Sequence, residues 1–321
     1  MSVANASTAT GTTGTADLQS RPGPSAAVYR GRFAPSPTGP LHLGSLVAAV
    51  GSFLEARRNH GEWWVRIEDL DTPRVRPGAA DAILRLLERL HLIPDGEICY
   101  QSTRNERYRE ALQTLQRAGR AFPCACSRSD LEVRPCRGGC QAVATPGTAV
   151  AWRLRLDPDD NLSFADAFQG PQRGPRVPLD SPVLMRKDGI AAYQLAVVVD
   201  DASQGMTDVV RGADLLESTH WQIAVYRALD FSPPRFAHLP LVVSDDGSKL
   251  SKSRSAAAVA DLAASEALRQ TLTCLSHPVP VSLEGAKPRE ILEWATAAWD
   301  PRRLQDRKIC PSVAITDRPV C

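Results

Sequence analysis

The stretch Arg32-Phe33-Ala34-Pro35-Ser36-Pro37-Thr38-Gly39-Pro40-Leu41-His42-Leu43-Gly44 separates a short apolar segment from a long helical pattern. Residues 29–34 predict a strand that the prolines end. Residues 43–59 predict a helix, because apolar side chains recur on one face and Gly61 follows its end. A loop of small residues that enters a helix N-terminus can bind phosphate, since unpaired N–H groups and the helix dipole face the ligand.

Three residues of this loop suit a nucleotide. Gly39 and Gly44 carry no Cβ and would let the backbone approach closely. His42 would present a hydrogen-bond donor to a phosphate oxygen. Taken alone, a proline-rich turn with a surface histidine explains the same residues equally well, because short motifs often occur by chance.

Strand and helix patterns alternate beyond this loop. Further strands are expected at 63–67, 207–211 and 236–243, and further helices at 78–91, 105–118 and 214–229. The segments 183–186 and 190–194 flank the turn Lys187-Asp188-Gly189 and predict a hairpin. Such alternation is typical of a parallel sheet with crossover helices, so the predicted fold class is α/β, with a Rossmann-type parallel sheet as its core.

Changes in composition divide the chain. Residues 1–27 are rich in Ser, Thr, Ala and Gly and predict a disordered tail. Residues 28–121 and 183–255 are interpreted as the two halves of the Rossmann domain. Residues 122–182, which are rich in Cys, Gly and Pro, predict an insertion, and residues 256–321 predict a short, basic, helical C-terminal region.

The overall composition is that of an ordinary globular protein. Of 321 residues, 43% are hydrophobic and 23% are charged, and 38 Lys and Arg against 36 Asp and Glu leave a net charge of +2. So small an excess excludes a protein that only coats nucleic acid, and RNA contact would need a local patch. No apolar run reaches the roughly 18 residues of a membrane helix, and no secretory signal is recognisable. We expect a cytoplasmic monomer without a membrane partner.

Four of the eight cysteines lie close together in the predicted insertion, namely Cys124, Cys126, Cys136 and Cys140. Four thiolates can enclose one Zn²⁺ as a closed tetrahedron, and such a site would order a glycine-rich segment that lacks its own core. Because no position would stay open for water, this zinc would be structural. Four unlinked thiols or two disulfides are the alternatives.

A second loop supplies lysines. Lys249-Leu250-Ser251-Lys252-Ser253 follows the last predicted strand, after a turn at 244–247. Two lysines three residues apart in a Gly/Ser loop can both reach a polyphosphate. They would stabilise the charge that builds up on an α-phosphate and on departing pyrophosphate. A solvated surface loop is the alternative, and the presence of both loops in this chain order argues against it.

Together the two loops resemble the HIGH region (Pro35 to Gly44) and the KMSKS loop (Lys249 to Ser253) of class I aminoacyl-tRNA synthetases. Further segments narrow the resemblance to the glutamyl-tRNA synthetases: RFAPS at 32–36, RIEDLD at 66–71, Tyr193 with VVVDD at 197–201, and VVRG at 209–212. The resemblance extends over about residues 29–253 and implies activation of L-glutamate by ATP with Mg²⁺.

The resemblance also implies roles for single residues. Glutamate carries two carboxylates and an ammonium, so its pocket needs cations at one end and an anion at the other. Arg32 and Arg211 would hold carboxylate, Tyr193 would hydrogen-bond the ligand, and Glu68 would meet the ammonium. The glutamate pocket would be completed by Phe33, Ala34, Pro35 and Ser36. ATP would be bound by Thr38, Gly39, His42, Gly44 and Lys252, and the catalytic residues would be His42, Lys249 and Lys252.

The chain after Ser253 is too short for the helical domain with which a tRNA-charging synthetase reads the anticodon. This layout resembles the glutamyl-queuosine tRNA(Asp) synthetases, truncated paralogues that glutamylate a modified wobble base. The implied partner is the queuosine-containing anticodon loop of tRNA(Asp). Its phosphates could contact Arg302, Arg303, Arg307 and Lys308, although a solvated helix face explains these residues equally well. The alternatives are a truncated synthetase that charges tRNA(Glu) and a non-catalytic RNA-binding paralogue.

Overall fold

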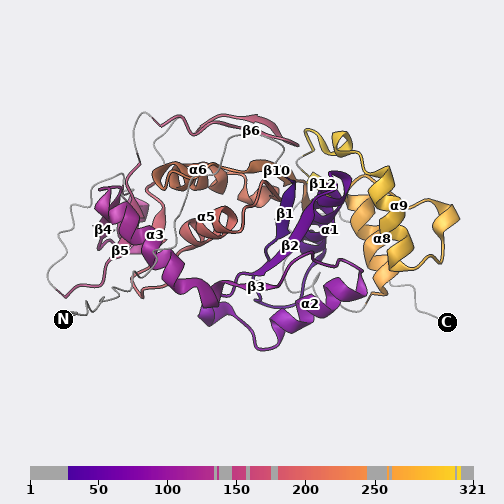
Figure 1. The fold of residues 1–321 in the computed structure, drawn as a ribbon, viewed down its shortest axis with the longest axis horizontal. Coiled ribbons are helices and arrows are strands. Elements are labelled where there is room, and N and C mark those ends of the chain that lie inside the picture. The colour runs from indigo at the N-terminus through magenta and orange to yellow at the C-terminus, as the bar shows by residue number, and fades with distance from the viewer. Residues whose placement is uncertain are drawn as a thin grey trace, which may run out of the picture.

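The computed structural model describes the chain from the first predicted strand into the C-terminal region. The described residues are 28–133, 136, 147–156, 160–174, 180–243, 259, 262–307 and 309–311. The predicted N-terminal tail, Cys140, Lys308 and the loop 249–253 with Lys249 and Lys252 lie outside them. The described part is elongated, with the C-terminal helices at one end and strands of the predicted insertion at the other (Figure 1).

The first half of the fold is a parallel sheet with its crossover helices. The strands β1 (Arg30–Phe33), β2 (Glu62–Ile67) and β3 (Cys99–Tyr100) pair in parallel, in the order β1-β2-β3. The helix α1 (Leu43–Arg58) follows β1, and η1 (Thr72–Arg74) and α2 (Ala79–Arg89) follow β2. The predicted order of strands and helices is confirmed here.

Trp63 locks α1 against this sheet. Its side chain is fully buried, lies stacked over Phe33 with ring centroids 6.4 Å apart, and meets Phe53 of α1 edge-on at 5.4 Å. The indole N–H donates to Ser52 Oγ (2.9 Å), so the polar atom of this large side chain is satisfied as well. Because these contacts fix α1 relative to β1, they also fix the two ends of the loop that joins them.

A second set of strands extends the sheet. The strands β6 (Phe164–Asp166), β9 (Asp208–Gly212) and β10 (Arg235–Leu239) are parallel, β7 (Gly170–Gln172) is antiparallel to β6, and the order is β7-β6-β10-β9. Thr207 N–H donates to Arg30 O (3.0 Å), which places β9 beside β1. The strands β2 and β3 therefore extend the sheet on the side of β1, and β10, β6 and β7 extend it in the opposite direction on the side of β9. In such sheets ligands bind at this switch point, outside the carboxyl ends of the strands.

The predicted hairpin at 183–194 is wrong in its second half. The strand β8 (Val183–Met185) and a turn at Gly189 (φ 79°) are present, but after one bridge from Met185 to Ala191 the chain enters α5 (Tyr193–Ser203). The valines at 197–199 favour a strand in isolation. They are buried among α3, α6 and β8, and this packing overrides their propensity.

Two other predicted boundaries also differ from the structure. The helix predicted at 214–229 consists of η3 (Ala213–Leu215) and α6 (Ser218–Ala228). The strand predicted at 236–243 is divided into β10 and β11 (Leu241–Val243) by Pro240, which has no N–H for a strand ladder.

The strands β6 and β7, which lie within the predicted insertion, belong to the sheet of β9 and β10, and two other strands of the insertion join β8 in a small antiparallel sheet. Its strands are β4 (Ala121–Cys124), β5 (Ala151–Leu154) and β8, in the order β4-β5-β8, and α4 (Arg128–Val133) follows β4. The chain reaches it through η2 (Gln101–Arg104) and α3 (Asn105–Arg117). Leu154 and Leu184 share a buried cluster with Tyr108 of α3 and Leu195 of α5, so this sheet is anchored on the Rossmann domain.

The C-terminal region is helical, as predicted. It comprises α8 (Ala264–Cys274), η4 (Val281–Leu283), α9 (Pro288–Ala298), η5 (Pro301–Leu304) and β12 (Ile309–Pro311), which pairs in parallel with β11. Trp299 donates its indole N–H to Glu55 Oε1 of α1 (2.7 Å), and burial raises the pKa of Glu55. The C-terminal helices thus belong to the same core as α1.

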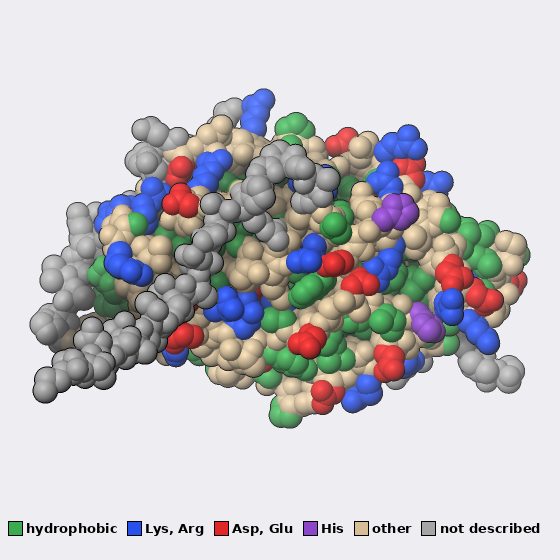
Figure 2. Space-filling model, viewed as in Figure 1, with side chains coloured by type: hydrophobic (Ala, Val, Ile, Leu, Met, Phe, Trp, Pro, Cys, Tyr) green, Lys and Arg blue, Asp and Glu red, His purple; other side chains and the backbone are tan. Residues whose placement is uncertain are grey.

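The surface is consistent with the nearly balanced net charge. On the face shown in Figure 2, basic and acidic side chains are interspersed over the described part of the molecule. None of the helices in that part is both long enough and apolar enough to cross a membrane.

Candidate active site

A cavity of about 1260 Å³ lies between the loop after β1, the N-terminus of α1 and the end of β9. The predicted site residues that line it are Arg32, Phe33, Ala34, Pro35, Ser36, Thr38, Gly39, His42, Gly44, Tyr193 and Arg211. The fold thus brings together the β1–α1 loop, the first residue of α5 and the last part of β9. Glu68 is not among the lining residues, and Lys249 and Lys252 lie outside the described part of the chain.

The β1–α1 loop forms one wall of the cavity. His42 caps α1, since its Nδ1 accepts a hydrogen bond from Ser45 N–H (3.2 Å). In a neutral ring this contact puts the proton on Nε2, where it can be donated. Gly39 has a φ of 151°, which L side chains rarely adopt, and a Cβ at Gly44 would come within 3.1 Å of the His42 ring. The N–H groups at the start of α1 make this wall suited to phosphate.

Arg211 is buried in the opposite wall and has no carboxylate partner among the described residues. Its Nε donates to His238 Nε2 (3.1 Å), and its Nη2 donates to Thr219 Oγ1 (2.8 Å) and Gln222 Oε1 (2.7 Å). Its Nη1 is buried without a hydrogen-bond partner in the same set of residues. Burial lowers the pKa of Arg211, but a guanidinium stays charged in proteins. A carboxylate ligand would supply both the missing acceptor and the missing charge.

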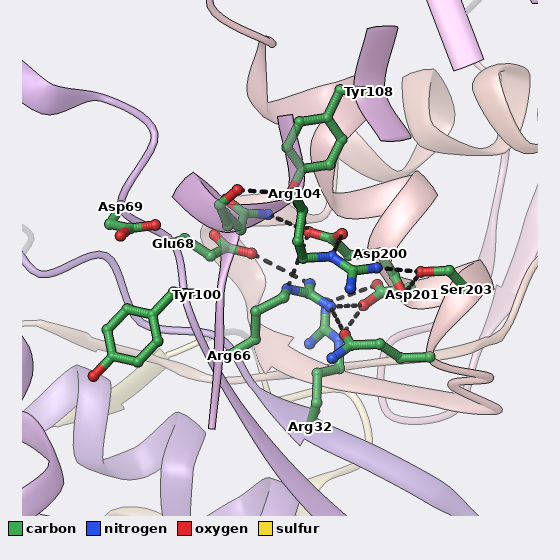
Figure 3. A network of polar contacts seen from close by, with 12 residues as sticks. Arg32, Arg66, Glu68, Asp69, Tyr100, Arg104, Tyr108, Asp200, Asp201 and Ser203 are labelled. Atoms are coloured by element: carbon green, nitrogen blue, oxygen red, sulfur yellow. Dashed lines mark hydrogen bonds and ion pairs between the residues drawn. The ribbon is translucent and has the colours of Figure 1, made fainter. Parts of the chain in front are cut away.

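Arg32 lines the same cavity, but its charge is compensated. Nε and Nη2 of Arg32 donate to the two oxygens of Asp201 (3.0 and 3.1 Å), and each side chain is only 3% exposed. Arg66 Nη1 donates to the same carboxylate (2.7 Å), so Asp201 bridges two buried arginines (Figure 3). Burial acts to raise the pKa of Asp201, but the charges of Arg32 and Arg66 outweigh it and hold the pKa below its ordinary value.

The neighbouring Asp200 extends this network of buried charges. Its Oδ1 accepts from Arg104 Nε (2.6 Å), and its Oδ2 accepts from Gln101 Nε2 and from Tyr108 OH, each at 2.8 Å. Asp200 and Asp201 both belong to α5, whereas their partners come from β1, β2, η2 and α3 (Figure 3). The network therefore holds α5, and with it Tyr193, against the sheet.

Glu68 lies beside this network and does not line the cavity itself, but it is hydrogen-bonded to a residue that does. Its Oε1 accepts from Arg66 Nη2 (3.3 Å), and its backbone N–H donates to the carbonyl of Pro35 (2.9 Å), which lines the cavity. Burial raises the pKa of Glu68, and the lowering by Arg66 and Arg32 does not offset it. Contact between Glu68 and a ligand ammonium stays a prediction.

No sequence motif points to the polar partners of Arg211. Thr219 and Gln222 lie three residues apart and thus on one face of α6, and His238 lies in β10. The available signal is weak: a Thr and a Gln at helical spacing, and a His within an apolar strand.

Three of the four predicted zinc ligands are described. Cys124 and Cys136 are buried, and with half-buried Cys126 they form a small cluster. Cys124 Sγ and Cys136 Sγ lie 3.8 Å apart. A disulfide bond measures about 2.0 Å, whereas two thiolates bound at about 2.3 Å to a tetrahedral zinc lie roughly 3.8 Å apart. In the described set, no three or more His, Cys, Asp or Glu side chains form a metal-binding group, and Cys140 is outside that set.

The predicted RNA-contacting arginines have local partners. Arg302 makes a two-pronged pair with Asp300 (2.9 and 3.0 Å), and Arg307 donates to Ser276 Oγ (2.9 Å). Arg303 donates to the carbonyl of the same serine (3.3 Å). Two other basic residues line the cavity itself, namely Arg74 and Arg76.

Comparison with known proteins places this geometry in a family context. The family model described as tRNA synthetases class I (E and Q), catalytic domain, matches residues 29–138 and 136–276. A glutamyl-Q tRNA(Asp) synthetase of Aromatoleum aromaticum is 49% identical over 291 residues, which cover 86% of this chain and 92% of that protein. One of Neisseria meningitidis is 45% identical over 295 residues, or 88% of this chain and 99% of that protein.

Solved structures of glutamate-tRNA synthetases share the fold of this chain. The chain is similar to a glutamate-tRNA synthetase of Elizabethkingia anophelis, with a TM-score of 0.64 and 29% identity over 70% of this chain. The match spans about half, 53%, of that longer protein. A glutamate tRNA ligase of Elizabethkingia meningosepticum, solved with its amino acid, has a TM-score of 0.71 at 23% identity, covering 90% of this chain and 68% of that one.

Proposed function

Since the chain belongs to the class I tRNA synthetases of the E and Q type and has their catalytic fold, we propose that it activates L-glutamate with ATP and glutamylates the queuosine of tRNA(Asp). Relatives at 45–49% identity carry the name glutamyl-Q tRNA(Asp) synthetase and align over most of both chains. The observation that carries the choice of amino acid is Arg211, whose buried Nη1 has no partner among the described residues.

The two carboxylates of glutamate have different places in this proposal. The α-carboxylate must meet the ATP phosphates at the N-terminus of α1, so the side-chain carboxylate is the one left for Arg211. Burial raises the pKa of Tyr193, although Arg211 acts to lower it, and its neutral phenol can donate to the ligand. Arg32, Ser36 and the backbone at 33–35 complete the pocket, and the ammonium lies toward Glu68.

ATP would lie along the β1–α1 loop, bound by Thr38, Gly39, His42 and Gly44. An oxygen of the glutamate α-carboxylate attacks the α-phosphorus, the bond from that phosphorus to the bridging oxygen breaks, and pyrophosphate leaves. Mg²⁺ supplies charge neutralisation on the phosphates when it is bound. His42 donates to a phosphate oxygen, and Lys249 and Lys252 compensate the charge of the transition state.

In the second step, a hydroxyl of the queuosine cyclopentenediol attacks the carbonyl carbon of glutamyl-adenylate. The hydroxyl loses its proton, AMP leaves, and an ester remains on the anticodon nucleoside. The reacting nucleotide must lie directly over the adenylate. Arg74 and Arg76 of the cavity wall are then placed to meet neighbouring backbone phosphates of the anticodon loop.

We also propose a structural Zn²⁺ held by Cys124, Cys126, Cys136 and Cys140. The 3.8 Å separation of Cys124 Sγ and Cys136 Sγ fits two thiolates on one ion. The bound ion would cross-link the segment after β4 and would take no part in activation.

Elemental analysis of protein purified without chelator tests the zinc site. We expect one zinc per chain, release of the metal in Cys124→Ser and Cys140→Ser, and retention in the control Cys99→Ser. Adenylate formation should suffer less than transfer to RNA. Metal-free protein with disulfides among these cysteines would contradict the site.

Pyrophosphate exchange tests the first step of the proposed function. Exchange should proceed with glutamate and ATP without tRNA, and far more slowly with glutamine or aspartate. Label from glutamate should then pass to tRNA(Asp) that contains queuosine and not to tRNA(Asp) with unmodified guanosine. Efficient labelling of the 3′ end of tRNA(Glu) would instead identify a tRNA-charging enzyme, and a complete lack of exchange would favour a non-catalytic RNA-binding paralogue.

A further inference from the structure

Behind Arg211, away from the cavity lining, lies a second buried pair of side chains. His238 of β10 and Asp166 of β6 are both fully buried, with His238 Nδ1 2.5 Å from Asp166 Oδ2. Neither residue belongs to a motif of the sequence, and neither lines the cavity. Among the described residues, His238 Nε2 contacts Arg211 Nε (3.1 Å), which links the pair to the cavity, and it also lies 3.2 Å from Thr219 Oγ1, another partner of Arg211.

The contacts determine which nitrogen of His238 carries the proton. Arg211 can only donate, so His238 Nε2 must accept, and the proton of the ring is on Nδ1. Nδ1–H then donates to Asp166. Burial lowers the pKa of His238 despite the hydrogen bond to Asp166, and the charge of Arg211 acts in the same direction. Burial acts to raise the pKa of Asp166, but the hydrogen bond with His238 holds it below its ordinary value. The pair is therefore a neutral imidazole and a carboxylate.

The second oxygen of Asp166 is already committed. Oδ1 accepts the backbone N–H groups of Phe168 (3.0 Å), Gln169 (2.9 Å) and His238 (3.0 Å). These bonds fix the carboxylate, so Oδ2 is held toward the imidazole. Asp166 thus selects one tautomer of His238, and that tautomer gives Arg211 an uncharged acceptor.

We propose that Asp166 and His238 are positioning residues for recognition of the glutamate side chain, which they serve by holding Arg211 through a tautomer-selected hydrogen bond. This inference rests on the proposed function. The described partners that hold Arg211 are all uncharged: an imidazole, a hydroxyl, a side-chain amide and the backbone carbonyl of Leu215. They orient the guanidinium and leave Nη1 without a partner among the described residues, so its charge is left for the carboxylate of glutamate.

The variant Asp166→Asn inverts the tautomer. The amide oxygen must stay with the three backbone N–H groups, so the amide NH₂ faces the ring and Nδ1 becomes an acceptor. The ring proton then moves to Nε2, where it faces the Nε–H of Arg211, donor against donor. We expect the KM for glutamate in pyrophosphate exchange to rise about 10- to 100-fold, by analogy with the loss of a hydrogen bond that orients a metal-binding histidine. The KM for ATP should not change.

Two substitutions at His238 form a matched pair. The amide of His238→Gln reaches the place of Nε2 and can present its oxygen to Arg211, whereas the amide of His238→Asn reaches only the place of Nδ1. The KM for glutamate should therefore stay nearly normal in the Gln variant and rise in the Asn variant. The double variant Asp166→Asn/His238→Gln should recover much of the affinity that Asp166→Asn loses, because glutamine has no tautomer to invert.

NMR of ¹⁵N-histidine-labelled protein reads the tautomer without any assay of activity. The proton should be on Nδ1 of His238 in the wild type and on Nε2 in Asp166→Asn, with thermal unfolding showing that both are folded. A wild-type proton on Nε2, an unchanged KM for glutamate in Asp166→Asn, or an equal rise in the KM for ATP would each overturn the inference. If the wild type showed no glutamate-dependent exchange at all, the proposed function would fail first, and this inference with it.

Discussion

Arg32 and Arg211 line one cavity, and both are buried, yet their surroundings are opposite. Arg32 donates through Nε and Nη2 to the carboxylate of Asp201, which also accepts a hydrogen bond from Arg66. Arg211 is surrounded by hydroxyl, amide and imidazole groups and has an unpartnered Nη1 among the described residues. The first region is a compensated network that builds the wall, and the second leaves a positive charge for the ligand.

The difference has an energetic meaning. A buried charge is tolerated when it is paired and hydrogen-bonded, and removal of one partner leaves an expensive unpaired charge. The network around Asp201 follows this rule, whereas Arg211 departs from it. Proteins accept such local destabilisation where it prepares a site for its ligand. The residue type alone therefore does not distinguish an arginine that stabilises the fold from one that binds the ligand. The charge of the neighbouring side chains does distinguish them.

The largest effect is expected from Asp201→Asn, which leaves Arg32 and Arg66 without their shared carboxylate. The free energy of unfolding should fall by about 3–5 kcal/mol, as for other broken buried pairs. The pKa of Asp201 is lowered in the folded state, so its contribution is present above the ordinary carboxyl pKa of about 4 and is lost as the pH falls toward the lowered value. Urea unfolding at several pH values between about 3 and 7 measures the loss of unfolding free energy and its pH dependence.

Glu293→Gln is the control for this variant. Glu293 pairs with Arg289 on α9, but these side chains are 62% and 73% exposed, so the change should be below about 0.5 kcal/mol. Equal losses in the two variants would mean that the buried network adds no more than a surface ion pair.

The next effect is expected from Arg211→Met, which keeps the bulk of the side chain and removes its charge. The kcat/KM for glutamate in pyrophosphate exchange should fall, by an amount that corresponds to a loss of about 2–5 kcal/mol of transition-state stabilisation. The free energy of unfolding should change far less than in Asp201→Asn, because the loss of hydrogen bonds to uncharged partners is offset by the removal of a buried unpaired charge. A loss of stability as large as that of Asp201→Asn would show instead that Arg211 stabilises the fold as the network around Asp201 does.

The smallest effect is expected from Glu68→Gln, at the border between the two regions. Because burial raises the pKa of Glu68, its folded-state pKa exceeds that of the unfolded chain, and a stability penalty sets in as the pH rises through this interval. The Gln variant lacks this penalty, so its free energy of unfolding should lie within about 1 kcal/mol of the wild type. Its KM for glutamate should rise if the carboxylate meets the ammonium. A stability loss near that of Asp201→Asn would make Glu68 part of the scaffold alone.

Local patterns were sufficient for much of the fold. The apolar spacing of α1 and α2 and the proline-ended β1 could be predicted because these signals act within a few residues. The helix α5 could not, since its valines favour a strand and only its burial between distant elements makes it helical.

The same limit applies to the site. The lining residues that were predicted could be found because they lie in short segments that carry a resemblance, whereas others, such as Arg74 and Asp214, could not. The compensation of Arg32 and the isolation of Arg211 could not, because both depend on partners far away in the sequence. Asp201 is 169 residues from Arg32, and His238 is 27 residues from Arg211 and 72 from Asp166.

In the proposed function, the uncompensated charge of Arg211 selects the side-chain carboxylate of glutamate. The most direct test of this selection is the ratio of kcat/KM for glutamate to that for glutamine in pyrophosphate exchange, in the wild type and in Arg211→Met. These amino acids differ only in the charge and hydrogen bonding of the side-chain end. We predict a wild-type ratio on the order of 10² or more and a ratio near one in the variant. An unchanged ratio in Arg211→Met would show that Arg211 does not select the carboxylate.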